Sequence, residues 1–456
     1  MTSVVGILNK RGVAIAADSA VTRSIGTMEK VTKNGNKMVR LSDVDPITVM
    51  FTGNGAFLSV TWDVIARKYR QQRGMIHHST VEELARDFFD YIASTPVFWS
   101  DEACDRILKY LTRKVFDEAN NEISNFYENA RKRNGTMVRP ATFRKAFIRN
   151  LRAIARDYSG QGRCPQFEGY KIEQFRKSAS GILDDFFNDK YDENLGNYDI
   201  PDILKDPVFE FFSSPKSGYV ISHYPKDVLE AIRPVFEETL LTVMGSRIED
   251  DFKAVLVFAG YGNDQKYPSL VSATVCEGYD FKVNYTINPK DIVCISDQRP
   301  VAICPFAQDD VIKSLIRGVY EGWSGNALSE LQDITNPWGF NVFDADSPEE
   351  EPDFEFNDLL DEVESDDLHA KFIREAGRLQ NAKQRKWEKA LERYDLEEMA
   401  TLADSLINLT EFHRILTFSQ EGVGGLVDLA VISRNEGFTW LRRKSWYNKD
   451  NGGFGI

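Results

Sequence analysis

The chain has 456 residues and a formal net charge of −14 at pH 7, and its length suggests about three domains. Its hydrophobic content of 42% is enough to build a large core, which excludes wholesale disorder. The negative charge argues against general nucleic-acid binding. We expect no signal peptide, because no charged and then apolar stretch precedes Thr2. Apolar runs such as Ala254–Ala259 are too short to cross a bilayer.

Cysteine and histidine usage predicts a cytoplasmic protein without a metal site or cofactor. The cysteines are odd in number and lack CxxC spacing, which favours reduced thiols: Cys104, Cys164, Cys276, Cys294 and Cys304. The histidines are scattered, and the one adjacent pair, His77-His78, lies in a polar loop.

The first residues predict a β-hairpin. Two apolar, β-branched runs, Ser3–Leu8 and Val13–Ala17, flank a polar Lys-Arg-Gly turn. Strands that fold back about this turn pair residues whose numbers sum to about 21. Thr2 then lies opposite Ser19, with Asp18 one step away, so the hairpin brings a carboxylate back to the first residues.

Thr2 is a candidate nucleophile. An initiator Met is usually trimmed before a small side chain, so we expect the mature chain to start at Thr2. A terminal Thr carries its own base, because an α-amine titrates near ~8. A buried Lys beside it would lower the pKa of the hydroxyl but needs a counter-charge. Lys37, which starts a predicted strand to Leu41, and Asp18 can form this pair.

A second candidate element is the glycine turn that follows the predicted strand Ile47–Gly53. The turn reads Gly53-Asn-Gly55. A backbone N–H at Gly53 could face a developing oxyanion.

The motifs TSVVGI, GVAIAAD, VT, KNGNKM and FTGNGA, in this order, resemble the β-subunits of the proteasome and the related bacterial HslV peptidases. These are N-terminal nucleophile (Ntn) hydrolases. The resemblance implies an α/β fold of four layers, an αββα sandwich. It also implies that Thr2 is the nucleophile, that Asp18 positions Lys37, and that Gly53 supplies the oxyanion-hole amide.

The same resemblance implies a substrate site. Thr22 matches the residue that binds the substrate backbone. Phe51 matches a position that lines the pocket for the side chain before the scissile bond. A bulky Phe there would favour small side chains, unless Gly55 and Gly35 reopen the pocket.

Along the rest of the chain, the pattern predicts an Ntn core interrupted twice. The predicted core parts are 1–96, 249–325 and 371–456, the helical insertion is 97–248, and the acidic insertion is 326–370. Helices are expected at Phe57–Arg73, Val81–Ala93, Glu102–Lys132, Pro140–Tyr158, Lys171–Phe187, Lys226–Met244, Asp309–Gly318, Lys371–Arg393 and Glu397–Thr417. Strands are expected at Phe252–Gly260, Tyr267–Val275, Phe281–Ile287, Ile292–Ser296, 424–433 and Gly437–Leu441.

The two insertions carry opposite charge. From Asp105 to Lys177 there are 17 Lys/Arg and 8 Asp/Glu, a net of +9, whereas Asp344–Asp367 holds 13 acidic residues and no Lys or Arg. One hypothesis is that the acidic segment docks on the basic insertion, in the same chain or from a neighbouring subunit. Plain solvation of an acidic loop, or nucleic-acid binding by Arg131–Arg156, are the alternatives.

Several positions depart from the family pattern. The places of an Asp and a Ser that hold the terminal amine fall on about Gln420 and Val423, neither of which can do this, although Ser419 or Glu421 could substitute. The Ser-Gly element that orients the nucleophile is replaced by Cys304–Ala307. A pair of Cys304 with His413 is a weaker candidate, because a buried structural Cys is the commoner case.

The resemblance therefore implies a threonine-type peptidase that acts on a peptide or protein and assembles as a homo-oligomer, with a ring and an unfoldase partner as options. Two alternatives stay open: an amidohydrolase of the same fold that cuts a small amide, and a catalytically weak subunit that acts as a scaffold or binding module.

Overall fold

The computed structural model describes residues 3–19, 21–25, 28–32, 35–134, 140–160, 162–190, 226–246, 252–307, 309–317, 378, 381–417 and 425–443. For 21–25, 28–32, 121–134, 140–143 and 226–227 it describes the backbone alone. Thr2 and the acidic segment Asp344–Asp367 lie outside these ranges.

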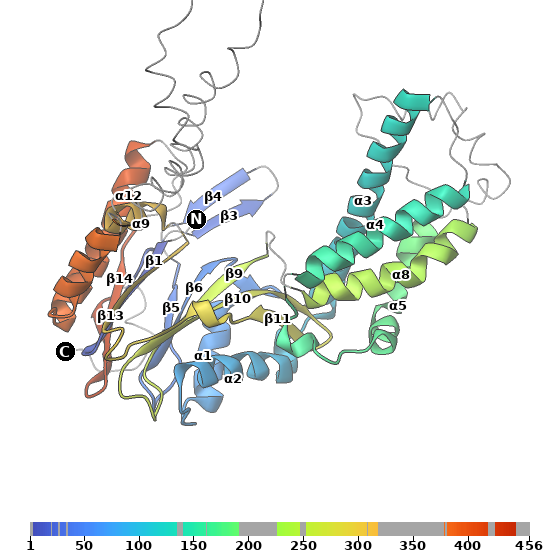
Figure 1. Cartoon of the computed structure of the whole chain (residues 1–456). Coiled ribbons are helices and arrows are strands. Elements are labelled where there is room, and N and C mark those ends of the chain that lie inside the picture. The colour runs from blue at the N-terminus through green and yellow to red at the C-terminus, as the bar shows by residue number, and fades with distance from the viewer. Residues whose placement is uncertain are drawn as a thin grey trace, which may run out of the picture.

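Two antiparallel sheets form the centre of the molecule (Figure 1). The first has the strand order β13-β1-β2-β14-β15, with bounds β1 Ser3–Asn9, β2 Gly12–Ala17, β13 Val301–Ala307, β14 Asp428–Ser433 and β15 Gly437–Arg442. The second has the order β11-β10-β9-β6-β5, with β12 also on β10; the bounds are β5 Met38–Arg40, β6 Ile47–Gly53, β9 Ala254–Gly260, β10 Ser269–Tyr279, β11 Lys282–Thr286 and β12 Ile292–Cys294.

Helices cover the outer face of each sheet (Figure 1). On the second sheet lie α1 Trp62–Arg73 and α2 Val81–Ser94, beside a group made of α3 Asp101–Asn134, α4 Pro140–Gly160, α5 Ile172–Asp189 and α8 Lys226–Gly245. On the first sheet lie α9 Asp310–Arg317, α12 Leu396–Leu416 and a helix at 381–391.

Three apolar clusters correspond to these interfaces. The cluster between the sheets contains Leu8 and Ile15 from the first sheet and Met50 and Val257 from the second, all fully buried. A second cluster lies between the first sheet and its helices. The largest runs without a break from α1 and α2 through the second sheet into the helical group. Because strand residues alternate between faces, a strand such as β14 contributes to two clusters, with Ala430 between the sheets and Val431 toward the helices.

The predicted mixed α/β class is confirmed, and so is the hairpin register. Val4 pairs with Ala17 and Asn9 with Gly12, so each pair sums to 21. The α2 start is also as predicted: the Thr80 side chain accepts the N–H of Glu83. The predicted domain boundaries stay predictions.

Two predictions are wrong in position. The helix expected from Phe57 begins at Trp62, because the chain first makes the short strands β7 Ala56–Phe57 and β8 Val60–Thr61. Leu58 and Ser59 between them have positive φ values, which no helix accepts. The segment from Cys304, for which no strand was expected, is part of β13.

The segment between Asp18 and Lys37 also differs from expectation. It forms a further hairpin of β3 Val21–Ile25 and β4 Met28–Thr32 rather than a plain connector.

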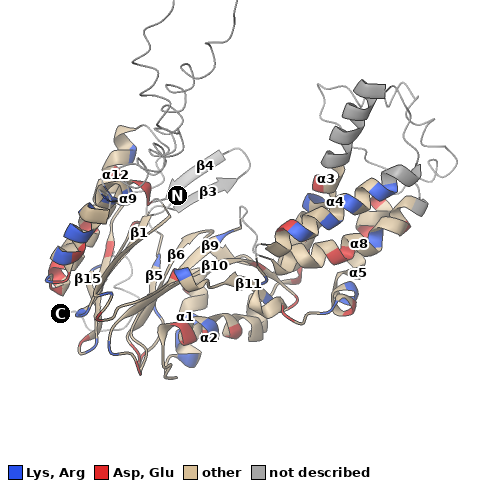
Figure 2. Ribbon diagram, viewed as in Figure 1, with Lys and Arg blue, Asp and Glu red and all other residues tan. Residues whose placement is uncertain are grey.

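The helical group carries both signs of charge (Figure 2). Arg233 pairs with Glu237 and Asp184, and Arg176 pairs with the same Glu237. On α4, Lys145, Arg149, Arg152 and Arg156 are exposed. The net positive charge predicted for this region is therefore partly compensated inside the group itself.

Candidate active site

The hairpin places Asp18 beside the first described residue. The backbone N–H of Asp18 donates to the Ser3 carbonyl at 3.1 Å, which continues the β1–β2 ladder by one step. In return the Ser3 N–H donates to Asp18 Oδ1 at 3.0 Å. Both residues are fully buried. The carboxylate is thus held one residue away from Thr2.

Lys37 shares the same carboxylate oxygen. Its Nζ lies 2.7 Å from Asp18 Oδ1, and its side chain is 5% exposed. The carbonyl of Lys37 accepts the N–H of Phe51 at 3.1 Å, so the register of β5 on β6 fixes the lysine backbone. An ammonium and a carboxylate this deeply buried are stable only as a hydrogen-bonded pair. The structure therefore brings Asp18 and Lys37 together, as the sequence predicts.

Gly53 is the last residue of β6, the strand whose Phe51 N–H bonds to the Lys37 carbonyl. It lies two residues beyond Phe51 and has φ +82°, a conformation that favours glycine. A Cβ at Gly53 would lie 2.5 Å from the carbonyl oxygen of Lys253, the residue before β9. A Cβ at Gly55 would meet nothing within 4 Å. The turn is thus closely packed at Gly53 and open at Gly55.

The remaining predicted residues are less informative. Thr2 lies outside the described residues, and so do Gln420 and Val423. Thr22 is on β3, where only the backbone is described. Phe51 is 7% exposed and packs in the apolar cluster that reaches α1. Its role in a substrate pocket stays a prediction.

Three polar residues next to the pair were not predicted. Ser3 supplies the backbone donor to Asp18. The Ser19 hydroxyl donates to the carbonyl of Leu426. Asp428 is 2% exposed and pairs in register with Ala17, the residue before Asp18. A charged residue inside the apolar run 424–433 was a readable signal, because such a residue is rarely buried without a partner or a function.

Cys304 and His413 do not form a catalytic pair. Cys304 packs against the cluster between the sheets, whereas His413 is exposed on α12, on the other side of the first sheet. Loss of hydration raises the pKa of the Cys304 thiol to about 12. A thiol with so high a pKa is a poor nucleophile at neutral pH.

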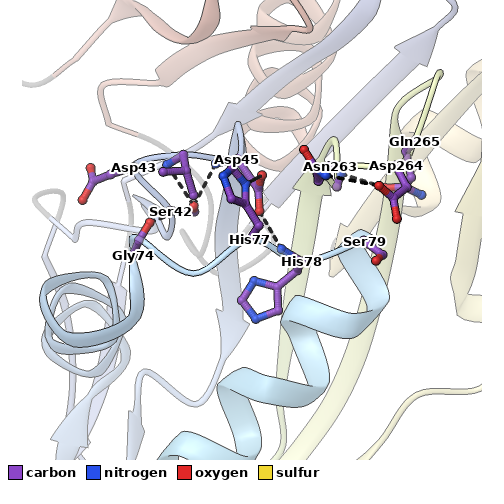
Figure 3. A network of polar contacts seen from close by, with 12 residues as sticks. Ser42, Asp43, Asp45, Gly74, His77, His78, Ser79, Asn263, Asp264 and Gln265 are labelled. Carbon is purple, nitrogen blue, oxygen red and sulfur yellow. Dashed lines mark hydrogen bonds and ion pairs between the residues drawn. The ribbon is translucent and has the colours of Figure 1, made fainter.

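The histidine pair has a structural role (Figure 3). Asp45 is buried between the two residues: its Oδ1 lies 2.9 Å from His77 Nδ1, and its Oδ2 accepts the backbone N–H of His78 at 2.8 Å. The His78 carbonyl accepts the N–H of Asn263, in the β9–β10 turn, at 2.7 Å. These bonds join the α1–α2 loop to two turns of the second sheet.

The described residues offer neither a metal-binding cluster nor a helix suited to a membrane. They hold no cluster of three or more His, Cys, Asp or Glu side chains suited to a metal ion. Within the same ranges, no helix has the length and apolar character that a bilayer crossing requires. The cytoplasmic location stays a prediction.

Comparisons with known proteins leave the family open. No family model matches the chain, and no curated protein matches it. Among solved structures, the chain is similar to the Anbu (Gly-1) mutant from Hyphomicrobium sp. strain MC1, with 10% identity and a TM-score of 0.25 over 97% of this chain and 86% of that one.

Proposed function

We propose that this protein is an N-terminal threonine hydrolase that cleaves amide bonds of peptides through an acyl-enzyme on Thr2, after removal of Met1. One observation carries the proposal: Asp18 Oδ1 accepts hydrogen bonds from both Lys37 Nζ and the Ser3 N–H, in a fully buried setting. A buried cation is thereby fixed close to the start of the chain. Burying the two charges costs desolvation energy, and apolar residues in the same space would often be at least as stable. Stability alone therefore does not explain why the pair is present.

The proposed chemistry starts with the Thr2 hydroxyl. Its oxygen attacks the substrate carbonyl carbon, and its proton passes to the α-amine of Thr2, whose pKa near ~8 suits a base at neutral pH. The Lys37 ammonium stabilises the negative charge that develops on the hydroxyl oxygen. Asp18 is a positioning residue, because it acts through Lys37 and through the Ser3 backbone.

The second half of the reaction returns the enzyme to its starting state. The Gly53 N–H stabilises the tetrahedral oxyanion. The α-ammonium gives its proton to the leaving amine as the C–N bond breaks, which leaves an ester on Thr2. Water, deprotonated by the same amine, then hydrolyses that ester and releases the acid. Peptide binding through Thr22, Phe51 and Gly55, assembly with further copies and an unfoldase partner belong to the same proposal.

The test is covalent labelling of the full chain with an N-terminal-threonine-directed epoxyketone, followed by intact mass and peptide mapping. The expected result is a chain that starts at Thr2 and carries one probe there. Thr2→Ala should abolish labelling. Ser3→Ala is the matched control, because the Ser3 hydroxyl is buried without a hydrogen-bond partner among the described residues; it should keep the labelling.

Cleavage assays then separate peptide from small-amide substrates. A panel of peptides and a panel of small amides are compared for the wild type and for Thr2→Ala. If the protein cleaves small amides and no peptides, it is an amidohydrolase of the same mechanism rather than a peptidase. A retained Met1, or an unlabelled Thr2 whose substitution changes no activity, would refute the hydrolase and favour a scaffold.

A further inference from the structure

A cavity of about 540 Å³ opens along the edge of the first sheet. Its walls are the edge strand β13, helix α9 and the helix at 381–391. We call it the edge pocket and define it by Arg299, Val301, Ile303, Lys313, Arg385 and Lys389. Its volume is within the range of ligand-binding pockets. The hydrolase proposal makes no use of it.

The edge pocket is positively charged in an acidic protein. Five of its lining residues are basic: Arg299, Lys313, Arg317, Arg385 and Lys389. Two are acidic, Glu388 and Glu392, and Lys313 is already paired with Asp309, just outside the lining, at 2.9 Å. With Asp309 included, the pocket carries a net charge of +2 (5 − 3), whereas the whole chain carries −14. A concave surface of one sign concentrates ligands of the opposite sign.

Apolar groups form part of the same walls. Val301 and Ile316 are buried, and Ile303 and Trp387 are half-buried. Pro305 also lines the pocket, and a proline on an edge strand discourages the addition of another strand. The expected ligand is therefore acidic with interspersed apolar side chains, and it binds through those side chains.

The chain contains such a segment, and it belongs to the connection between two walls of the pocket. Residues 318–377 join Arg317, which lines the pocket from α9, to the helix at 381–391. Within them, Asp344–Asp367 has 13 acidic residues, no Lys or Arg, and the apolar residues Phe354, Phe356, Leu359 and Leu360.

The connection is long enough for that segment to reach the pocket. On either side, 318–343 and 368–377 provide 26 and 10 residues, which span up to roughly 85 and 33 Å at about 3.3 Å per residue. A tether of this kind keeps the segment at an effective concentration on the order of millimolar.

We propose that Asp344–Asp367 docks in the edge pocket of its own chain, with carboxylates on the basic rim and phenylalanine side chains against Ile303 and Trp387. The exposed basic residues of α4 are the rival surface. They offer charge, but the other exposed residues on that helix are small or polar, such as Ala153 and Asp157. The edge pocket matches both the charge and the apolar content of the segment.

The test is zero-length carbodiimide crosslinking of the full chain, which joins a lysine amine to a carboxylate in contact, read by peptide mass spectrometry. Lys389 and Lys386 form an internal comparison: both are exposed on the same helix, but only Lys389 lines the pocket. Tethering alone predicts similar yields for the two. Docking predicts a yield of links to 344–367 that is roughly tenfold higher at Lys389.

Matched substitutions and an isotope mixture complete the test. Arg385→Glu should reduce the Lys389 links several-fold, whereas Lys386→Glu, with the same charge change on the same helix, should not. Links from the wild type should also fall at high salt, which screens exposed charges. Because the salt titration uses the wild type, it tests the docking even if a variant fails to fold.

Three outcomes would overturn the proposal. The first is equal linking at Lys386 and Lys389. The second is preferential linking of the segment to Lys145 on α4. The third, from a mixture of ¹⁴N- and ¹⁵N-labelled protein, is links that join two different chains only.

Discussion

Lys37→Met would remove the cation from the buried pair and leave the Asp18 carboxylate fully buried without it. Loss of one partner of a buried ion pair costs about 3–5 kcal/mol, and a factor of ten corresponds to about 1.4 kcal/mol. The Ser3 N–H still donates to the carboxylate, so we expect a cost at the lower end of this energy range. Amide exchange in β1 and β2 should therefore accelerate about 10²- to 10³-fold.

The assay is hydrogen–deuterium exchange resolved by peptide, because it reports local stability in a chain of this size. Lys10→Met is the matched control. Lys10 Nζ also lies 2.7 Å from a carboxylate, Asp297, but that pair is solvent-exposed, so its loss should leave the exchange unchanged. In the double variant Asp18→Asn/Lys37→Met neither charge of the pair remains, so its exchange should be slower than that of Lys37→Met alone.

Two results would refute this reasoning. One is an exchange rate in Lys37→Met that matches that of Lys10→Met. The other is a double variant whose destabilisation equals the sum of the two single ones, since additivity would mean that the two charges do not interact.

Gly53→Ala should lower the melting temperature, because φ is +82° and the added Cβ would lie 2.5 Å from a carbonyl oxygen, whereas Gly55→Ala should not; scanning fluorimetry that finds equal shifts would contradict this. Asp45→Ala removes the acceptor of the buried His78 N–H, so it should cost about 1–3 kcal/mol by urea denaturation, and an unchanged midpoint would count against it. Cys304, with a thiol pKa near 12, should react with iodoacetamide more slowly than free cysteine at pH 8 and faster as the pH rises, since the thiolate is the reactive form; equal rates at pH 8 would disprove it.

The local sequence pattern was sufficient to predict those elements whose structure depends on one turn or one helix cap. The register of the first hairpin follows from two apolar runs and one polar turn, and the start of α2 follows from the Thr80 cap. The meeting of Asp18 with Lys37 was also readable, because a hairpin returns Asp18 to the chain start and a buried lysine needs a counter-charge.

Other features depend on contacts that a sequence does not display. β13 contains Pro305, which weakens the strand signal, and it forms because the edge of β1 is available to it. The short strands before α1 require positive φ at Leu58, whose N–H donates to the distant Glu277 carboxylate at 2.5 Å. Asp428 reaches the neighbourhood of the pair only through the pairing of β14 with β2.

The strand order has a consequence for synthesis on the ribosome. Asp18, Lys37 and Gly53 all lie within the first 53 residues, but β2, which precedes Asp18, pairs with β14, and β6, which ends at Gly53, pairs with β9. The β6–β9 pairing alone closes a loop of about 200 residues, and long-range pairings of this kind form slowly. The nascent chain therefore holds every proposed catalytic group long before it can assemble them, and the buried pair forms only when almost the entire polypeptide has emerged.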